Sequence, residues 1–190
     1  MNKIIFKTAL VTLGALVAAA VAVFSLWILI SPQTMASYCE KTGNYSFAVT
    51  CADLRYKYTK DVKDLARCAQ DGIASGKDAL IVKYCEMLIG HESFDDLCKS
   101  VDESIPSTEY GKYATDYKAY VCGNLAAAQY RGGNLDKALK TAESGKSFVK
   151  LVIEIIENGT AEEADKALAA LGDTDENLKK LLEEFKNEGK

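Results

Sequence analysis

The sequence predicts an all-α protein that begins with one membrane-spanning helix. Residues 8–30 contain no charged side chain, and a helix of that length crosses a hydrocarbon core of about 30 Å. Proline occurs only as Pro32 and Pro106, whereas Ala, Leu, Lys and Glu are abundant, a composition that favours helices. Apolar residues recur at helical spacing between glycines, and no alternating pattern indicates a strand.

The charges around residues 8–30 predict how this segment is oriented. Lys3 and Lys7 precede it, and the next cationic residue is Lys41. Because cationic flanks stay in the cytoplasm, residues 1–7 are expected there and the part of the chain after the anchor on the outer side of the cell membrane. The expected organism is a bacterium. The alternative is a cleavable signal peptide, but its apolar region is about 7 to 15 residues long. We therefore predict an uncleaved, single-pass signal-anchor.

The charge balance after the anchor limits the class of partner. Only two of the 23 basic residues lie before the span and all 27 acidic residues lie after it, which leaves that part with a net charge of −6. Nucleic acids and anionic lipids bind basic faces. The sequence therefore predicts that the protein has no nucleic-acid partner. It also predicts that only the anchor contacts the membrane.

Turn and capping residues divide the remaining chain into helices. Gly43, Gly76 and Gly133 mark the turns of three helical hairpins, and Pro32 suits the first position of a helix. Thr160 opens a capping box with Glu163. The expected helices are 32–42, 45–58, 61–74, 78–89, 93–103, 110–131, 135–144, 146–158, 160–171 and 173–187.

The hairpin turns share a register that indicates a repeat. Gly43 and Gly76 are 33 residues apart. An Ala lies seven positions before each turn glycine, at Ala36, Ala69 and Ala126. A period near 33 is typical of helical-repeat arrays.

Two segments, TGNYSFAVTCA and GGNLDKALKTA, resemble the turn and second helix of tetratricopeptide repeats. The matching positions are Gly43, Tyr45 and Ala48 in the first segment and Gly133, Leu135 and Ala138 in the second. The sequence departs from that pattern at Ile81, Cys122 and Gln129. The resemblance implies a TPR-like α-solenoid of stacked antiparallel hairpins over residues 31–145, with helices over 146–190 that cap the stack or dock on a partner.

Six cysteines on an exported chain permit disulfides. The hairpin arrangement favours a sequential pattern, in which Cys39 pairs with Cys51 and Cys68 with Cys85, since each pair flanks one turn. The remaining Cys98 and Cys122 then form the third pair. The alternative is six reduced, buried thiols that act as small apolar side chains. A metal site is not expected, because there is no C-x-x-C motif and the only imidazole is His91.

A series of tyrosines is the main candidate for a binding surface. Tyr110, Tyr113, Tyr117 and Tyr120 follow one another at helical spacing, and Tyr130 lies further along. Tyrosines combine apolar contact with a hydroxyl group, which suits recognition of a peptide or glycan. We expect Tyr113, Tyr117, Tyr120 and Tyr130 to form a candidate groove for a partner, and the TPR resemblance implies that Tyr120 and Tyr130 are best placed to face it. The alternative is a stripe that packs between helices.

The sequence therefore predicts a membrane-anchored, extracytoplasmic scaffold or accessory subunit that binds another protein or peptide. We assign no catalytic residues and no cofactor, because no nucleophile, base and acid set is apparent. Two other functions are open: a module that binds an envelope polymer or small solute, and a glycan hydrolase that uses two carboxylates. The hydrolase requires two acids about 5 to 10 Å apart in a cleft.

Overall fold

The structure is a computed structural model that describes residues 2–105, 110 and 113–187. Over these residues the chain forms eleven α-helices and no strand, which confirms the all-α prediction. The helices are α1 (Asn2–Ile30), α2 (Pro32–Lys41), α3 (Tyr45–Thr59), α4 (Val62–Ala74), α5 (Asp78–Ile89), α6 (Phe94–Ser104), α7 (Tyr117–Arg131), α8 (Leu135–Ser144), α9 (Val149–Asn158), α10 (Ala161–Leu171) and α11 (Glu176–Asn187).

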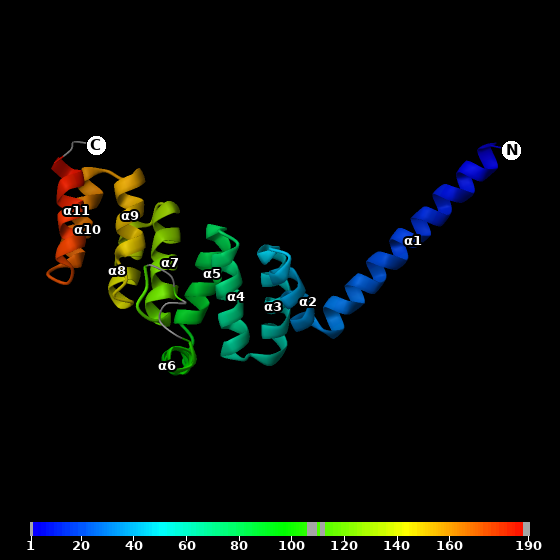
Figure 1. Ribbon diagram of the computed structural model, residues 1–190, viewed down its shortest axis with the longest axis horizontal. Coiled ribbons are helices and arrows are strands. Elements are labelled where there is room, and N and C mark those ends of the chain that lie inside the picture. The colour runs from blue at the N-terminus through cyan, green and yellow to red at the C-terminus, as the bar shows by residue number, and fades with distance from the viewer. Residues whose placement is uncertain (1, 106–109, 111–112, 188–190) are drawn as a thin grey trace.

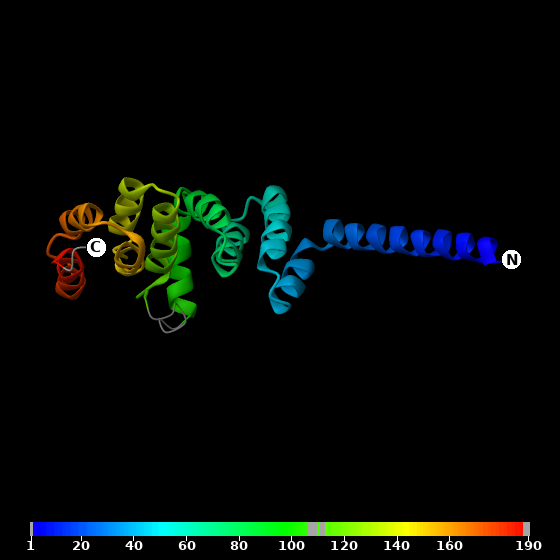
Figure 2. The ribbon, with the colours of Figure 1, turned by 90° about the horizontal axis from the view of Figure 1, so that it is seen from above.

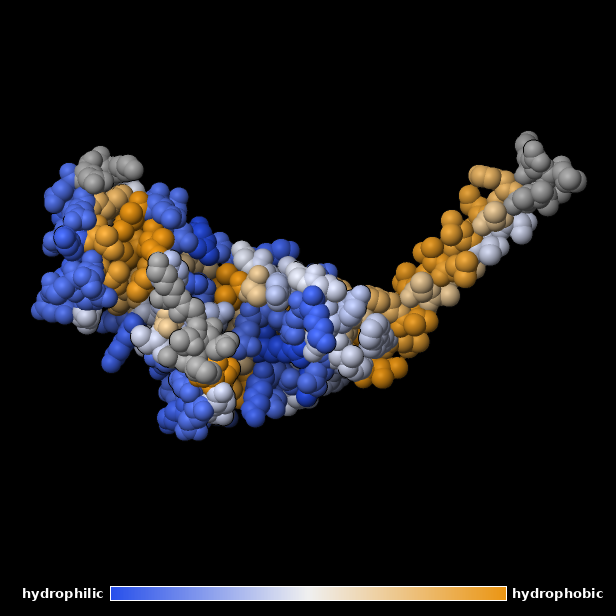
Figure 3. Space-filling model, viewed as in Figure 1, coloured by the Kyte–Doolittle hydropathy of each residue, from blue (hydrophilic) through white to orange (hydrophobic). Residues whose placement is uncertain are grey.

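Helix α1 contains the predicted apolar segment. Within its stretch Phe6–Ile30, an 18-residue window has a mean hydropathy of 2.6 and none of that window is buried. Figures 1 and 3 show it as an apolar rod that projects from the other helices. Its C-terminal end is packed, since the ring of Phe24 stacks 6.0 Å from that of Phe47 in α3. Helix α1 therefore has the length and composition of a membrane anchor or signal sequence.

Helices α2 to α11 follow one another along the long axis of the molecule, as Figures 1 and 2 show. Helix α2 packs against α3, α3 against α4, and α4 against α5. Helix α5 packs against α7, and α7 packs against both α8 and α9. Helix α6 lies beside this row and contacts α4 and α7. The connection from α5 to α7 thus passes over one side of the row.

The glycines predicted to end the first helix of each hairpin have the same backbone geometry. Gly43 and Gly133 have φ angles of 75° and 80°, which glycine adopts without steric cost. After each glycine the next N–H returns to the preceding helix, from Asn44 to Cys39 O at 2.8 Å and from Asn134 to Gln129 O at 3.0 Å. These bonds complete a helix C-cap, which explains why glycine recurs in the sequence register.

Helix α7 lies between two hydrophobic clusters of the core. Twelve of its 15 residues are buried. Val121 and Leu125 belong to a cluster formed with α3 to α6, whereas Ala126 and Tyr130 pack with α8 to α11. This one helix therefore joins the two halves of the row.

The predicted helix 110–131 is wrong at its N-terminal end, because α7 begins at Tyr117. The Asp116 carboxylate caps it by accepting the N–H of Ala119 at 2.8 Å. The carboxylate of Asp102, at the end of α6, accepts the N–H of Tyr117 at 2.9 Å. Two acceptors at these free N–H groups start the helix here. Pro106 and residues 111–112 lie outside the described residues.

The C-terminal helices are close to the sequence prediction. Thr160 and Glu163 form the predicted capping box, in which the Glu163 carboxylate accepts the N–H of Thr160 at 2.9 Å. In α11 the side chains of Leu178, Leu182 and Phe185 are buried in the second cluster. The apolar face of α11 thus covers the last part of the core, and a further apolar area remains visible over the C-terminal helices in Figure 3.

Candidate functional site

A groove of about 640 Å³ lies where α2, α3 and α4 face the connection from α6 to α7. We call it the tyrosine groove. Four tyrosines and four polar or charged side chains contribute to its wall. The lining residues are Glu40, Tyr45, Arg67, Gln70, Asp71, Ala74, Ile105, Tyr110, Tyr117 and Tyr120.

Three of the tyrosines form one aromatic wall. The ring centroids of Tyr110, Tyr117 and Tyr120 are 6.1 to 6.4 Å from one another. The wall is held in place by Asp102, which accepts the Tyr110 hydroxyl at 2.7 Å as well as the N–H of Tyr117. Because one carboxylate fixes both a ring and the start of α7, the wall is positioned before any ligand arrives.

The structure separates the four tyrosines that the sequence grouped as a partner groove. Tyr120 lines the tyrosine groove and is partly exposed, whereas Tyr117 lines it from within the first core cluster and is 1 % exposed. Tyr113 lies in a turn before α7 and is not part of the lining. Tyr130 is buried in the second core cluster, where its hydroxyl lies 3.2 Å from a carboxylate oxygen of Glu163. Tyr130 therefore has the packing role that the sequence offered as the alternative.

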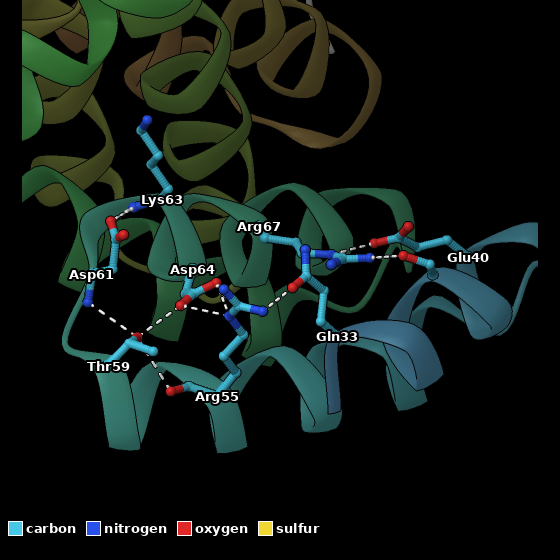
Figure 4. A network of polar contacts seen from close by, with 9 residues as sticks. Gln33, Glu40, Arg55, Thr59, Asp61, Lys63, Asp64 and Arg67 are labelled. Atoms are coloured by element: carbon cyan, nitrogen blue, oxygen red, sulfur yellow. Dashed lines mark hydrogen bonds and ion pairs between the residues drawn. The ribbon is translucent and has the colours of Figure 1, made fainter. Parts of the chain in front are cut away.

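The opposite wall carries an ion pair between α2 and α4. Arg67 Nε donates to Glu40 Oε1 at 2.7 Å, and Arg67 Nη2 donates to Ser37 Oγ, also at 2.7 Å (Figure 4). The hydrogen bond to Glu40 raises the pKa of the Arg67 guanidinium above its usual value. The charge of Arg67 is thus engaged within the protein.

Asp71 lies on the same face of α4 as Arg67, one turn further on. It is only 5 % exposed, and its Oδ2 atom has no hydrogen-bond partner among the described residues. Burial raises the pKa of its carboxyl group to about 7, with a further rise from Glu40 that outweighs the opposing effect of Arg67.

A polar network near the N-terminal end of α4 holds this wall in place. Arg55 of α3 forms an ion pair with Asp64 of α4 at 2.8 Å and donates a hydrogen bond to Gln33 of α2. Thr59 donates to the same Asp64 at 2.7 Å. Figure 4 shows these contacts joining the three helices. The network fixes the spacing of the helices that carry Glu40, Tyr45 and Asp71.

The six predicted disulfide partners are free, buried thiols in this structure, and no disulfide is seen. Cys39 and Cys51 share one core cluster, as the hairpin argument expects. Cys68, Cys85 and Cys98 lie together in the first core cluster. The arrangement follows the alternative of small apolar side chains.

Burial also determines the reactivity of these thiols. It raises the pKa of Cys68 and Cys85 to about 12. The thiolate is the nucleophile and the metal ligand, and these thiols stay protonated at neutral pH. Among the described residues no group of three or more His, Cys, Asp and Glu side chains is placed to hold a metal ion.

Sequence reasoning missed Asp71, Arg67 and Tyr45 as lining residues. A signal for Asp71 is present, because it falls on the face of α4 whose other residues are small or apolar and buried, including Leu65 and Cys68. An acidic residue on a buried face requires a partner or a function.

Over the described residues, the fold and the groove define an all-helical protein with one N-terminal apolar helix and a groove lined by tyrosines and acidic residues. Comparison of the chain with protein-family models, with curated proteins and with solved structures found no match.

Proposed function

We propose that this protein is a membrane-anchored, extracytoplasmic helical-repeat module that binds a segment of another protein in the tyrosine groove. The observation that carries the proposal is the groove itself, which combines an ordered aromatic wall with the Oδ2 atom of Asp71, an acceptor without a partner among the described residues. Tyrosines dominate protein interfaces because they bury large areas at low entropic cost. The row of helices and its repeated glycine turns support a TPR-like solenoid as the scaffold.

Binding accounts for the groove better than hydrolysis by two carboxylates. Glu40 and Asp71 are the acids of the lining, and they are close enough for the charge of Glu40 to raise the pKa of Asp71. Glu40 is also held by Arg67. A glycan hydrolase needs two separate carboxyl groups, about 5 Å or more apart, with the sugar between them. The groove instead offers a continuous wall to a ligand.

Photocrosslinking at Ala74 tests the proposed groove. Ala74 lines the groove and is exposed, so a benzoylphenylalanine there leaves the core intact. In membranes of the native host we expect a discrete covalent adduct from this position. Tyr58 is the matched control, because it is 75 % exposed and lies at the far end of α3 from Tyr45. Equal adducts from both positions, or none from Ala74, contradict the proposal.

The proposed orientation has its own test. Because all six native thiols are buried, a new cysteine at the exposed Tyr58 is expected to dominate the reaction with a membrane-impermeant maleimide. We expect Tyr58→Cys to be labelled on intact cells, and Asn2→Cys to be labelled only after the cells are opened. The reverse pattern places the helices α2 to α11 in the cytoplasm.

A further inference from the structure

Asp71 has one carboxyl oxygen, Oδ2, for which the described residues supply no hydrogen-bond partner. A buried polar atom without a partner is rare, because it loses its hydrogen bonds to water and gains none in return. Asp71 is 5 % exposed, lines the tyrosine groove and leaves Oδ2 without a partner among the described residues. A hydrogen-bond donor of a ligand that enters the groove would supply the partner that Asp71 Oδ2 lacks among the described residues.

The charges nearby decide what kind of donor this is. Arg67 is the cation of the lining, but it already donates to Glu40 and to Ser37. The groove is therefore lined by two acidic side chains and one basic side chain, and the basic one is already paired with Glu40. A ligand with a positive charge and an N–H group compensates Asp71, whereas an anionic ligand meets two carboxyl groups.

The aromatic wall suits the same ligand. The rings of Tyr110, Tyr117 and Tyr120 pack together, with Tyr110 and Tyr117 buried and Tyr120 partly exposed. Tyr45 contributes a second partly exposed ring from α3. Tyrosine rings attract cations at their faces, and they pack against the methylene groups of a long basic side chain. The net charge of −6 after the anchor also attracts a basic ligand over longer distances.

We propose that the tyrosine groove binds a lysine or arginine side chain of the partner, whose ammonium or guanidinium group donates to Asp71 Oδ2 between the tyrosine rings. This inference rests on the proposed function and names the chemistry of the segment that is bound. The alkyl part of the side chain lies along the tyrosine wall, and the charged end reaches the acids on α2 and α4.

A random library of short peptides provides the probe. The full chain, in nanodiscs of neutral phosphatidylcholine, is used to select binding peptides, and each is measured again with Ala74→Trp. Ala74 is exposed at the groove, so this variant fills the groove without disturbing the core. Peptides that it releases are bound in the groove.

We expect the groove-dependent peptides to contain a lysine or arginine that they need for binding. Acetylating that lysine, or replacing that arginine with citrulline, is expected to weaken binding about tenfold or more, as for the loss of a charge-assisted hydrogen bond. In Asp71→Asn the neutral and charged peptides are expected to bind alike. Acetylation of the peptide leaves the protein unchanged, so its result does not depend on how a variant folds.

Two results overturn the inference and separate it from the proposed function. If groove-dependent peptides lack basic residues, or are unaffected by neutralising them, the groove binds peptides but Asp71 does not select a cation. If no peptide is released by Ala74→Trp, the tyrosine groove is not a peptide site and both proposals fail.

Discussion

Replacing Gly145 with alanine is expected to lower the free energy of unfolding by about 3 kcal/mol, at the upper end of the cost of overpacking a core. Gly145 is the C-cap of α8, and its φ of −91° is one that alanine adopts without strain. The added Cβ would lie 2.2 Å from Cβ and 2.7 Å from Sγ of Cys122. Cys122 is fully buried in α7, so neither helix yields without disturbing the core.

Gly132→Ala is the matched control for this prediction. Gly132 caps α7 with a φ of −79°, and a Cβ added there would have Gln129 O as its nearest neighbour at 3.4 Å, an ordinary contact. We expect a change of about 0.5 kcal/mol or less, and a small gain is consistent with the lower chain entropy of alanine. Urea unfolding of the full chain in detergent, followed by circular dichroism, measures both variants. Equal losses contradict a steric role for Gly145.

Replacing Asp71 with asparagine is expected to stabilise the protein above pH 7. Burial raises the pKa of Asp71 from 3.8 to about 7, so the folded state holds a proton that the unfolded state has released. The stability of the wild type therefore falls as the pH rises from about 4 to about 7, and the loss is complete above that range. Asparagine removes this dependence. At about pH 8 the gain is expected to be roughly 2 to 4 kcal/mol, and at about pH 4 close to zero.

Asp64→Asn is the control on the same helix. Asp64 forms an ion pair with Arg55 and accepts the hydroxyl of Thr59, so we expect this substitution to destabilise the protein at neutral pH. Urea unfolding at several pH values compares the two variants. A destabilised Asp71→Asn protein at about pH 8 would show that its carboxylate is satisfied within the fold, and the ligand proposed for it would lose its basis.

Together, the expectations for Asp71 describe a residue that serves ligand binding in the groove and lowers the stability of the fold. The Asp71→Asn protein is expected to be more stable and yet unable to distinguish a charged from a neutral side chain. Loss of discrimination in this variant is therefore not attributable to unfolding. Residues that reduce stability where they serve function are common at binding sites.

The helices themselves follow from local sequence. The turn glycines, the Thr160 capping box and the start of α2 at Pro32 lie where the pattern predicts them, because caps and turns depend on neighbours within a few residues. The apolar segment of α1 is equally local, since its composition alone makes it long and apolar enough for a membrane. The N-terminus of α7 is the exception, because part of its cap comes from Asp102 in another helix.

The groove was decided by tertiary structure. The sequence grouped Tyr113, Tyr117, Tyr120 and Tyr130 by spacing, and only the middle two line the groove. The rest of its wall comes from α2, α3 and α4, in which Glu40 and Tyr120 are 80 residues apart. The periodicity of one helix shows which residues share a face, but not which other helix meets that face. Helix packing determines that, and here it placed Asp71, whose Oδ2 has no partner among the described residues, beside the tyrosines.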